Sequence, residues 1–295
     1  MNQGESILIV GGAGMLAKAF VRKLGARGVT PVVLSRAQLD VTDAAAVREA
    51  FEKHRPTIVL NCSAYTKVDL AEQEQAQANA VNGTAVGILA AAAKDVGATF
   101  VHFSTDFVFS GKSDHPYKID EPTGPLSAYG RSKSLGEELF AKLADPNRSL
   151  LIRTAWLYGP GGPSFPRTMI TAARAGKPLT VVADQTGAPT FTFDLADATL
   201  DLLARGATGV HHVTNAGQTN WFEFTKAIVE EFGMKDHPVS PTTSAEWFKI
   251  RPTSATRPSY SVLDLSKTES AMGRPMRPWR DALREYRDVV NAEGM

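Results

Sequence analysis

The stretch that decides the fold is Phe100–Leu139, which begins FVHFSTDFVFSGK and ends SAYGRSKSLGEEL. Its first six residues form an apolar run with the length and composition of a buried strand, and Thr105 stands at the carboxyl end of that run. The last part has the pattern of a helix, in which Tyr129 and Lys133 are one turn apart on the same face. The stretch therefore predicts a hydroxyl, a phenol and an ammonium group near the end of a strand.

These three groups are what a carbonyl reductase needs. A phenol can donate a proton to the carbonyl oxygen while a cofactor donates hydride to the carbon. Because a free tyrosine, with a pKa of about 10, is a poor acid or base near neutrality, we expect the Lys133 cation to lower the pKa of Tyr129. The Thr105 hydroxyl is expected to hydrogen-bond the substrate oxygen. The alternative is an exposed aromatic–cation pair on a solvated helix.

A glycine-rich turn near the N-terminus supplies the expected cofactor site. Residues 6–10 form the apolar run SILIV, which enters GGAGMLA. The turn fits G-x-x-G-x-x-A with Gly11, Gly14 and Ala17, or G-x-G-x-x-A with Gly12 in the first position. In both alignments the glycines allow a tight turn and let backbone amides approach a pyrophosphate at the start of the next helix. The amphipathic segment that follows supports a dinucleotide site.

The second apolar run, residues 31–34, bears on the choice of cofactor. A NAD-selective site usually places a carboxylate after this run to bind the ribose 2′-hydroxyl, whereas this chain has Ser35 and Arg36. Arg36 can pair with a 2′-phosphate, so we predict a preference for NADPH, with NADH as a second option. The alternative is a solvated loop arginine. Asp40, in LDVTD, is expected to reach the adenine amine.

Apolar runs alternate with helical stretches, which predicts an α/β fold with a Rossmann-type, doubly wound parallel sheet and helices on both faces. Ser63 and Ala64 follow the third apolar run and leave room for the cofactor's ribose and phosphates. We also expect a long alanine-rich helix over about residues 72–96, a continuous strand over SLLIRTAWLYG (149–159), and a C-terminal amphipathic helix that closes the fold.

Beyond residue 159 the segments become shorter and richer in proline and glycine. This change indicates elements that cover the carboxyl edge of the sheet, where open α/β sheets bind ligands. We therefore predict an NADP(H)-binding domain over residues 1–159 and a mainly substrate-binding lobe over residues 160–295, with segments at about 179–215 returning to the sheet.

Composition narrows the class of protein. The chain has 295 residues, of which 43% are hydrophobic and 21% charged, and a net charge of +1, so no strong field favours nucleic acid or an anionic membrane. The single cysteine, Cys62, excludes an internal disulfide and is expected to be a buried structural thiol. His211 and His212 are neighbours in a strand and face opposite sides, which argues against a shared metal site. Without a signal segment or long apolar run, we expect a cytoplasmic protein.

The motifs GGAGMLA, LDVTD, NCSAYTKVDLAE, FSTDFVFSG, YGRSK, IRTAWLYG, DQTGAPT and RPSYSVLDLSK stand in the order and spacing of the extended short-chain dehydrogenase/reductases. Within these, the whole chain resembles the dTDP-4-dehydrorhamnose reductases. The resemblance implies NADPH-dependent reduction of the 4-keto group of a dTDP-4-dehydro-6-deoxy sugar, in particular dTDP-4-dehydro-L-rhamnose to dTDP-L-rhamnose. The resemblance is compatible with a homodimer. Some family members form a metal-linked dimer through an acidic residue in the first helix, but this chain has Ala19 at that position, so no metal is expected.

The resemblance also assigns residues by position. Thr105, Tyr129 and Lys133 match the catalytic set, and Lys133 would also bind the nicotinamide ribose. The matching cofactor positions are Gly11, Gly14, Met15, Leu16, Asp40, Val41, Ser63, Ala64 and Tyr65. The matching substrate positions are Val68, Thr105, Asp106, Phe107, Tyr129, Trp156 and Gln185. Trp156 could stack on a sugar or nucleotide face or simply pack in the core, and Arg257 could reach the diphosphate or remain a solvated loop residue.

Three other functions stay open at this stage. A related nucleotide-sugar reductase or 4-epimerase would use the same triad, and an epimerase would keep its NAD bound. A non-catalytic NADP-binding subunit is a second option, because the regulatory subunit of methionine adenosyltransferase resembles this family. A redox-sensing protein that binds NADPH and a protein partner is the third. The intact Thr105–Tyr129–Lys133 set favours an enzyme.

Overall fold

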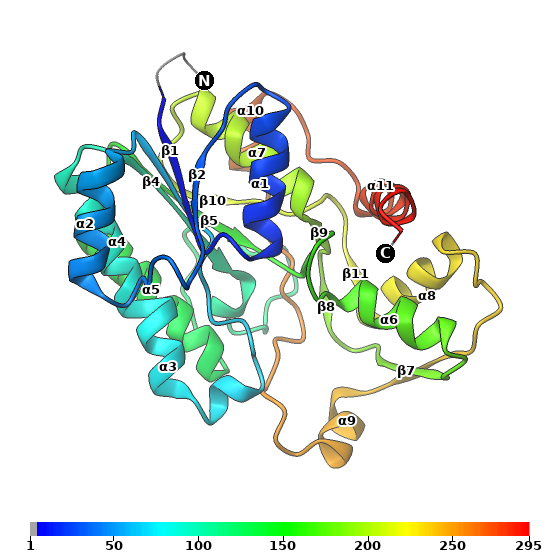
Figure 1. Cartoon of the computed structure of the whole chain (residues 1–295). Coiled ribbons are helices and arrows are strands. Elements are labelled where there is room, and N and C mark those ends of the chain that lie inside the picture. Colours follow the sequence, from blue (N-terminus) through cyan, green and yellow to red (C-terminus); the bar gives the residue numbers. More distant parts are fainter. Residues whose placement is uncertain (1–4, 295) are drawn as a thin grey trace.

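The computed structural model describes residues 5–294. Figure 1 shows a central sheet with helices on both faces and a smaller lobe, containing α6, α8 and α9, to one side of it. Within the described residues, no helix has the length and apolar character that crossing a membrane requires.

The central sheet has six strands in the order β10-β5-β4-β3-β1-β2, and every neighbouring pair is parallel. The strands are β1 (Ile7–Val10), β2 (Val32–Leu34), β3 (Ile58–Asn61), β4 (Thr99–Thr105), β5 (Ser149–Thr154) and β10 (Gly209–His212). The chain runs outward from β1 to β2 and then returns to β3 on the other side of β1. Such a reversal opens a crevice at the carboxyl ends of the strands. The predicted doubly wound sheet is confirmed.

Both faces of the sheet are buried, as the near-continuous apolar strands require. Ile7 and Ile9 of β1 lie in one core cluster with residues of α1 (Met15–Gly25) and α7 (Thr192–Ala204). Leu8 and Val10 point the other way, into a cluster with residues of α2 (Ala44–His54) and α4 (Ala85–Asp95). Because successive side chains of β1 point to opposite faces, a layer of helices packs on each face of the sheet.

The helix predicted over residues 72–96 is interrupted. The structure has a 3-10 turn, η1 (Leu70–Glu72), then α3 (Gln75–Asn79), a π-helical turn η2 (Ala80–Thr84), and α4. The side chain of Asn82, inside the π turn, accepts a hydrogen bond from the Tyr65 amide at 2.8 Å and donates one to the Tyr65 carbonyl at 3.0 Å. The widened turn therefore fixes the loop after β3, a common use of π turns near functional sites.

The strand expected over residues 149–159 is also divided. β5 ends at Thr154, and the short β6 (Leu157–Tyr158) pairs with β9 (Thr190–Phe191) instead of continuing in the central sheet. Trp156 lies between them with φ of 45°, a left-handed conformation that is strained for a large side chain. This turn is the reason that the continuous strand prediction was wrong.

The smaller lobe is built from short elements. It contains α6 (Phe165–Arg174), β7 (Leu179–Val182), β8 (Thr186–Gly187), β11 (Thr219–Asn220), α8 (Trp221–Glu231), β12 (Val239–Thr242) and α9 (Ser244–Ile250). β7 pairs with β12, β8 pairs with β11, and β10 alone of the later strands joins the central sheet. The predicted division at residues 159/160 stays a prediction.

The last two helices are α10 (Ser266–Met272) and α11 (Trp279–Ala292). Leu283, Tyr286 and Val290, spaced along one face of α11, are buried in the main core. The C-terminal amphipathic helix predicted from the sequence is confirmed.

Candidate active site

Helix α5 (Ala128–Leu143) carries two of the predicted catalytic groups. The Ser127 hydroxyl caps it by accepting a hydrogen bond from the Gly130 amide at 3.1 Å. A Cβ atom on Gly130 would lie 2.4 Å from the Phe107 carbonyl oxygen, so only glycine lets α5 come this close to η3 (Asp106–Val108). The close approach seats the Tyr129 ring edge-on to Phe107, with centroids 5.5 Å apart.

The third group, Thr105, ends β4 directly beneath this helix. Its hydroxyl donates to Asp106 Oδ1 at 2.9 Å and accepts from the Phe107 amide at 3.2 Å. The Thr105 hydroxyl also acts on the Tyr129 phenol, whose pKa it tends to lower. Thr105 and Tyr129 thus line the same cavity, and their catalytic roles stay predictions.

These residues line a cavity of about 390 Å³ at the carboxyl edge of the sheet. Among the predicted site residues, it brings together Gly14, Met15, Leu16, Ser63, Ala64, Thr105, Tyr129, Lys133 and Trp156. We call this the catalytic cavity. A second cavity of about 230 Å³ shares Gly14, Ser63 and Ala64 with it and continues to Gly11, Arg36, Asp40, Val41 and Tyr65. Together they form a long site that begins at the catalytic groups and passes the N-terminus of α1.

The expected effect of Lys133 on Tyr129 is wrong for this structure. Burial, followed by the nearby Asp106 carboxylate, raises the pKa of Tyr129 to about 12, and the Thr105 hydroxyl only partly opposes this. The Lys133 ammonium donates to the Phe103 carbonyl at 2.5 Å. Desolvation of the phenolate therefore dominates the pKa of Tyr129, and the phenol keeps its proton.

Two neighbouring side chains also have shifted pKa values. Burial lowers the pKa of Lys133 to about 8, while the carboxylate of Glu137 acts in the opposite direction. Burial raises the pKa of Asp106 to about 6, against hydrogen bonds from Ser261 and Thr105. Within residues 5–294, Asp106 Oδ2 has no hydrogen-bond partner. Shifted groups of this kind gather at functional sites.

The turn between β1 and α1 fits a dinucleotide. Gly11 has φ of 78°, and a Cβ atom on it would lie 2.5 Å from the Ser63 nitrogen. A Cβ atom on Gly12 would lie 2.4 Å from a Val33 methyl group, so each of the two alternative alignments contains a glycine that the structure needs. Gly14 precedes the first turn of α1 and lines both cavities. The free amides at this helix start suit a pyrophosphate.

The far end of the site carries the groups expected near the adenosine. Hydrogen bonds from the side chain and amide of Thr42 lower the pKa of Asp40, and the Arg36 guanidinium adds to this. Arg36 forms no salt bridge within the described part of the chain, which leaves its guanidinium available for a phosphate. Ser35 does not line either cavity, because its hydroxyl donates to Gln38 Oε1 at 2.8 Å.

The predicted substrate residues are only partly gathered. Trp156 lines the catalytic cavity and also stacks on Trp221, with centroids 3.5 Å and planes 9° apart. One ring face is therefore packed, and stacking on a sugar or nucleotide stays a prediction. Gln185 and Arg257 line a different cavity of about 350 Å³ in the lobe, beside Trp221 and Trp247. Arg257 donates a hydrogen bond to Asp69 Oδ1 at 2.9 Å. Its side chain is therefore paired and is not the solvated loop arginine considered above. The remaining three, Val68, Asp106 and Phe107, do not line the cavities described here.

Several lining residues are missing from the sequence-based site. Asn61 and Thr154 end β3 and β5 and face the catalytic cavity, together with the Gly161–Pro163 loop. Their position at strand ends was the available signal. Cys62 lines both cavities and is half-buried, less enclosed than expected, although burial raises the pKa of its thiol. A protonated thiol agrees with a structural role.

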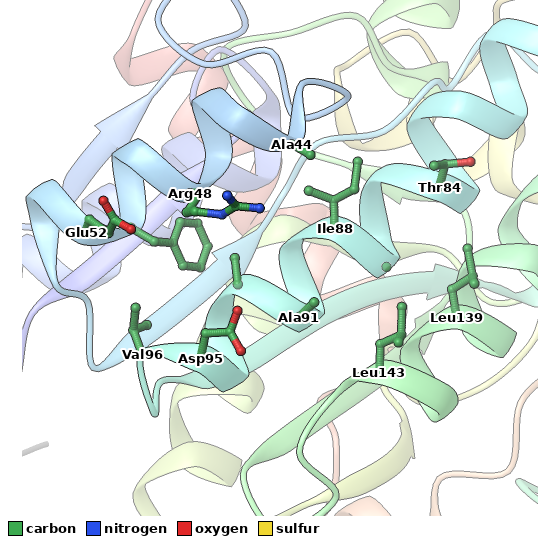
Figure 2. Close-up of a pocket in the computed structure, with 13 residues that line it drawn as sticks. Ala44, Arg48, Glu52, Thr84, Ile88, Ala91, Asp95, Val96, Leu139 and Leu143 are labelled. Carbon is green, nitrogen blue, oxygen red and sulfur yellow. The ribbon is translucent and has the colours of Figure 1, made fainter.

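An open groove of about 610 Å³ lies between α2, α4 and α5 and shares no lining residue with the catalytic cavity. Figure 2 shows Arg48 and Asp95 on one side of it, Leu139 and Leu143 on the other, and Ile88 between them. Among the residues that the structure describes there, none is a histidine, cysteine or tyrosine. Across residues 5–294, histidine, cysteine and carboxylate side chains form no cluster able to hold a metal.

A family model described as the RmlD substrate binding domain matches residues 5–291. The chain is 44% identical over 283 residues to a dTDP-4-dehydrorhamnose reductase of Streptomyces griseus, which covers 94% of this chain and 91% of that protein. This chain belongs to the dTDP-4-dehydrorhamnose reductase family.

Other members of the family show its range. The crystal structure of dTDP-4-dehydrorhamnose reductase from Bacillus anthracis, in complex with NADP, has a TM-score of 0.90 and 33% identity, covering 96% of this chain and 98% of that one. A Streptomyces niveus protein named dTDP-4-keto-6-deoxy-D-glucose reductase is 37% identical over 286 residues, covering 97% of this chain and 98% of that protein. The family resemblance is confirmed, while the roles of individual site residues stay predictions.

Proposed function

We propose that this chain uses NADPH to reduce the 4-keto group of a dTDP-4-dehydro-6-deoxy sugar, with dTDP-4-dehydro-L-rhamnose as substrate and dTDP-L-rhamnose as product. The observation that carries the proposal is the placement of Thr105, Tyr129 and Lys133 in one cavity that continues past the N-terminus of α1. Membership of the reductase family supports the same chemistry.

Different residues of the cavity serve binding and proton transfer. When bound, NADPH supplies the hydride that C4 of the keto sugar accepts. Tyr129, whose raised pKa keeps it protonated before the reaction, donates its proton to the carbonyl oxygen, so C4 gains one hydrogen and O4 the other. Thr105 aligns that oxygen, and Lys133 binds the nicotinamide ribose and stabilises the phenolate left on Tyr129. Holding the reactants together supplies much of the acceleration.

The decisive test is the loss of NADPH absorbance when the purified protein meets dTDP-4-dehydro-L-rhamnose, generated in place by the upstream epimerase. We expect oxidation of NADPH that requires both the sugar and the protein. Binding of NADPH without turnover on any 4-keto sugar nucleotide would contradict the proposal and favour the non-catalytic subunit or the redox sensor.

A second reductase function is favoured by the Streptomyces niveus relative. Faster turnover of dTDP-4-keto-6-deoxy-D-glucose than of dTDP-4-dehydro-L-rhamnose would assign this chain to that substrate. Interconversion of C4 epimers without net consumption of cofactor would identify an epimerase instead. A homodimer and a cytoplasmic location stay predictions.

The cofactor preference gives a further prediction. Arg36→Ala is expected to weaken NADPH binding roughly 10- to 150-fold, because a charge-assisted bond to the 2′-phosphate contributes about 1.5–3 kcal/mol. NADH has no 2′-phosphate, so its affinity should stay unchanged. Titration of both cofactors into the wild type, Arg36→Ala and the exposed control Arg48→Ala checks this. Equal losses for NADPH and NADH would contradict the role of Arg36.

A further inference from the structure

A buried ion pair lies directly beside the catalytic lysine and has no role in the chemistry described so far. Arg153 of β5 and Glu137 of α5 have side chains only 7% and 12% exposed. The guanidinium binds the carboxylate with Nη2 at 2.7 Å from Oε2 and with Nε at 3.0 and 3.2 Å from the two oxygens. Its remaining nitrogen, Nη1, donates to the Ile119 carbonyl at 3.0 Å.

The pair joins β4 and α5, which carry the catalytic groups, to β5. Ser104, the residue before Thr105, donates its hydroxyl proton to Glu137 Oε1 at 2.5 Å. Glu137 follows Lys133 by one turn of α5, and Arg153 precedes Thr154, which lines the catalytic cavity. The carboxylate therefore ties the ends of β4 and β5 to the helix at the level of the lysine.

Stability alone does not account for such a pair. Removing two charges from water is costly, and apolar replacements of buried ion pairs are often neutral or stabilising. The fold could fill this space with apolar side chains, as it does elsewhere between α5 and the sheet. We therefore look for a functional role of the Glu137 charge. The group whose pKa it affects is the neighbouring Lys133.

The charged and titratable groups around Lys133 single out Glu137. From β4, His102 is fully buried, and from β5 and β10, Arg153 and His212 face the same region. From η3, Asp106 lies next to Thr105 and acts on Tyr129. Among these groups, Glu137 is the one whose charge raises the pKa of Lys133, against the effect of burial.

We propose that Glu137 is a positioning residue, which keeps Lys133 a cation inside the closed site and holds the Thr105 strand end against α5. The inference rests on the proposed function, because Lys133 is useful as a cation there only if the site holds the cofactor and a keto substrate. Ser104 and Arg153 fix the carboxylate in the orientation that this role requires.

The test compares Glu137→Gln with Glu138→Gln, the same change at the exposed neighbouring position of the same helix. NADPH affinity is measured across neutral and alkaline pH, together with kcat/KM for the keto sugar. In Glu137→Gln the pH at which affinity and kcat/KM fall should move down by about one unit, the size expected when a nearby buried charge is lost. Glu138→Gln should follow the wild type.

A second variant guards against a folding defect. Glu137→Gln leaves Arg153 buried without a partner, whereas Glu137→Gln combined with Arg153→Gln removes both charges. The double variant should show the same downward shift, because Glu137 is the group that acts on Lys133. An alkaline limb at the wild-type pH in either folded variant would overturn the inference. Failure of the wild type to bind NADPH would instead count against the proposed function.

Discussion

Replacement of Tyr129 by phenylalanine is expected to lower kcat about 1000-fold, within the range that a general acid contributes. The phenol is the proton donor in the proposed reaction, and phenylalanine keeps the ring that packs edge-on against Phe107. Because the ring is preserved, NADPH affinity and the free energy of unfolding should stay close to those of the wild type. Single-turnover measurement of NADPH oxidation with the keto sugar checks the rate.

Tyr260→Phe is the matched control for this experiment. Its phenol donates to Gln218 at 3.1 Å and does not line the catalytic cavity, so the same chemical change should leave kcat unaltered. Turnover by Tyr129→Phe at the wild-type rate would show that another group donates the proton.

Gly11→Val is expected to lower the free energy of unfolding by about 3 kcal/mol or more and to abolish NADPH binding. A non-glycine residue held at positive φ costs about 1–3 kcal/mol, and Gly11 has φ of 78°. The new Cβ would also meet backbone atoms of Cys62 and Ser63 at 2.5–2.7 Å, which can separate only if β1 and β3 move apart. Urea denaturation and NADPH titration measure the two effects.

Gly25→Ala provides the control for the glycine argument. Gly25 ends α1, and a Cβ atom there would meet nothing within 4 Å. The change should be neutral or stabilising by up to about 1 kcal/mol, because alanine is the better helix former. If Gly11→Val unfolded at the same urea concentration as Gly25→Ala, the turn would tolerate a side chain. The close approach of Gly11 to Ser63 would then make no contribution to the free energy of unfolding.

Much of the site could be predicted because its signals are local. The spacing of Tyr129 and Lys133 places them on one helix face whatever surrounds the helix. The run that ends at Thr105 was readable as a strand from its apolar pattern. Arg36 was identified by its distance from the glycine turn, and it lines the far cavity as that spacing indicates.

Other features could not be predicted from neighbouring residues. Asn61 and Thr154 face the cavity because parallel register aligns strand ends that lie far apart in the chain. The division of 149–159 depends on the left-handed Trp156, whose ring stacks on Trp221 of a distant helix. The contact that decides each case joins residues separated by dozens of positions.

The sequence by itself determined the order of strands and helices, the glycine turn and the residues predicted to be catalytic, since these depend on propensities and spacings within a few residues. Only the tertiary structure decided their protonation: burial and the nearby Asp106 raise the pKa of Tyr129, and burial lowers the pKa of Lys133 to about 8. The physical reason is that desolvation and charge–charge interactions depend on everything packed around a group in three dimensions. Spacing along the chain does not contain that information.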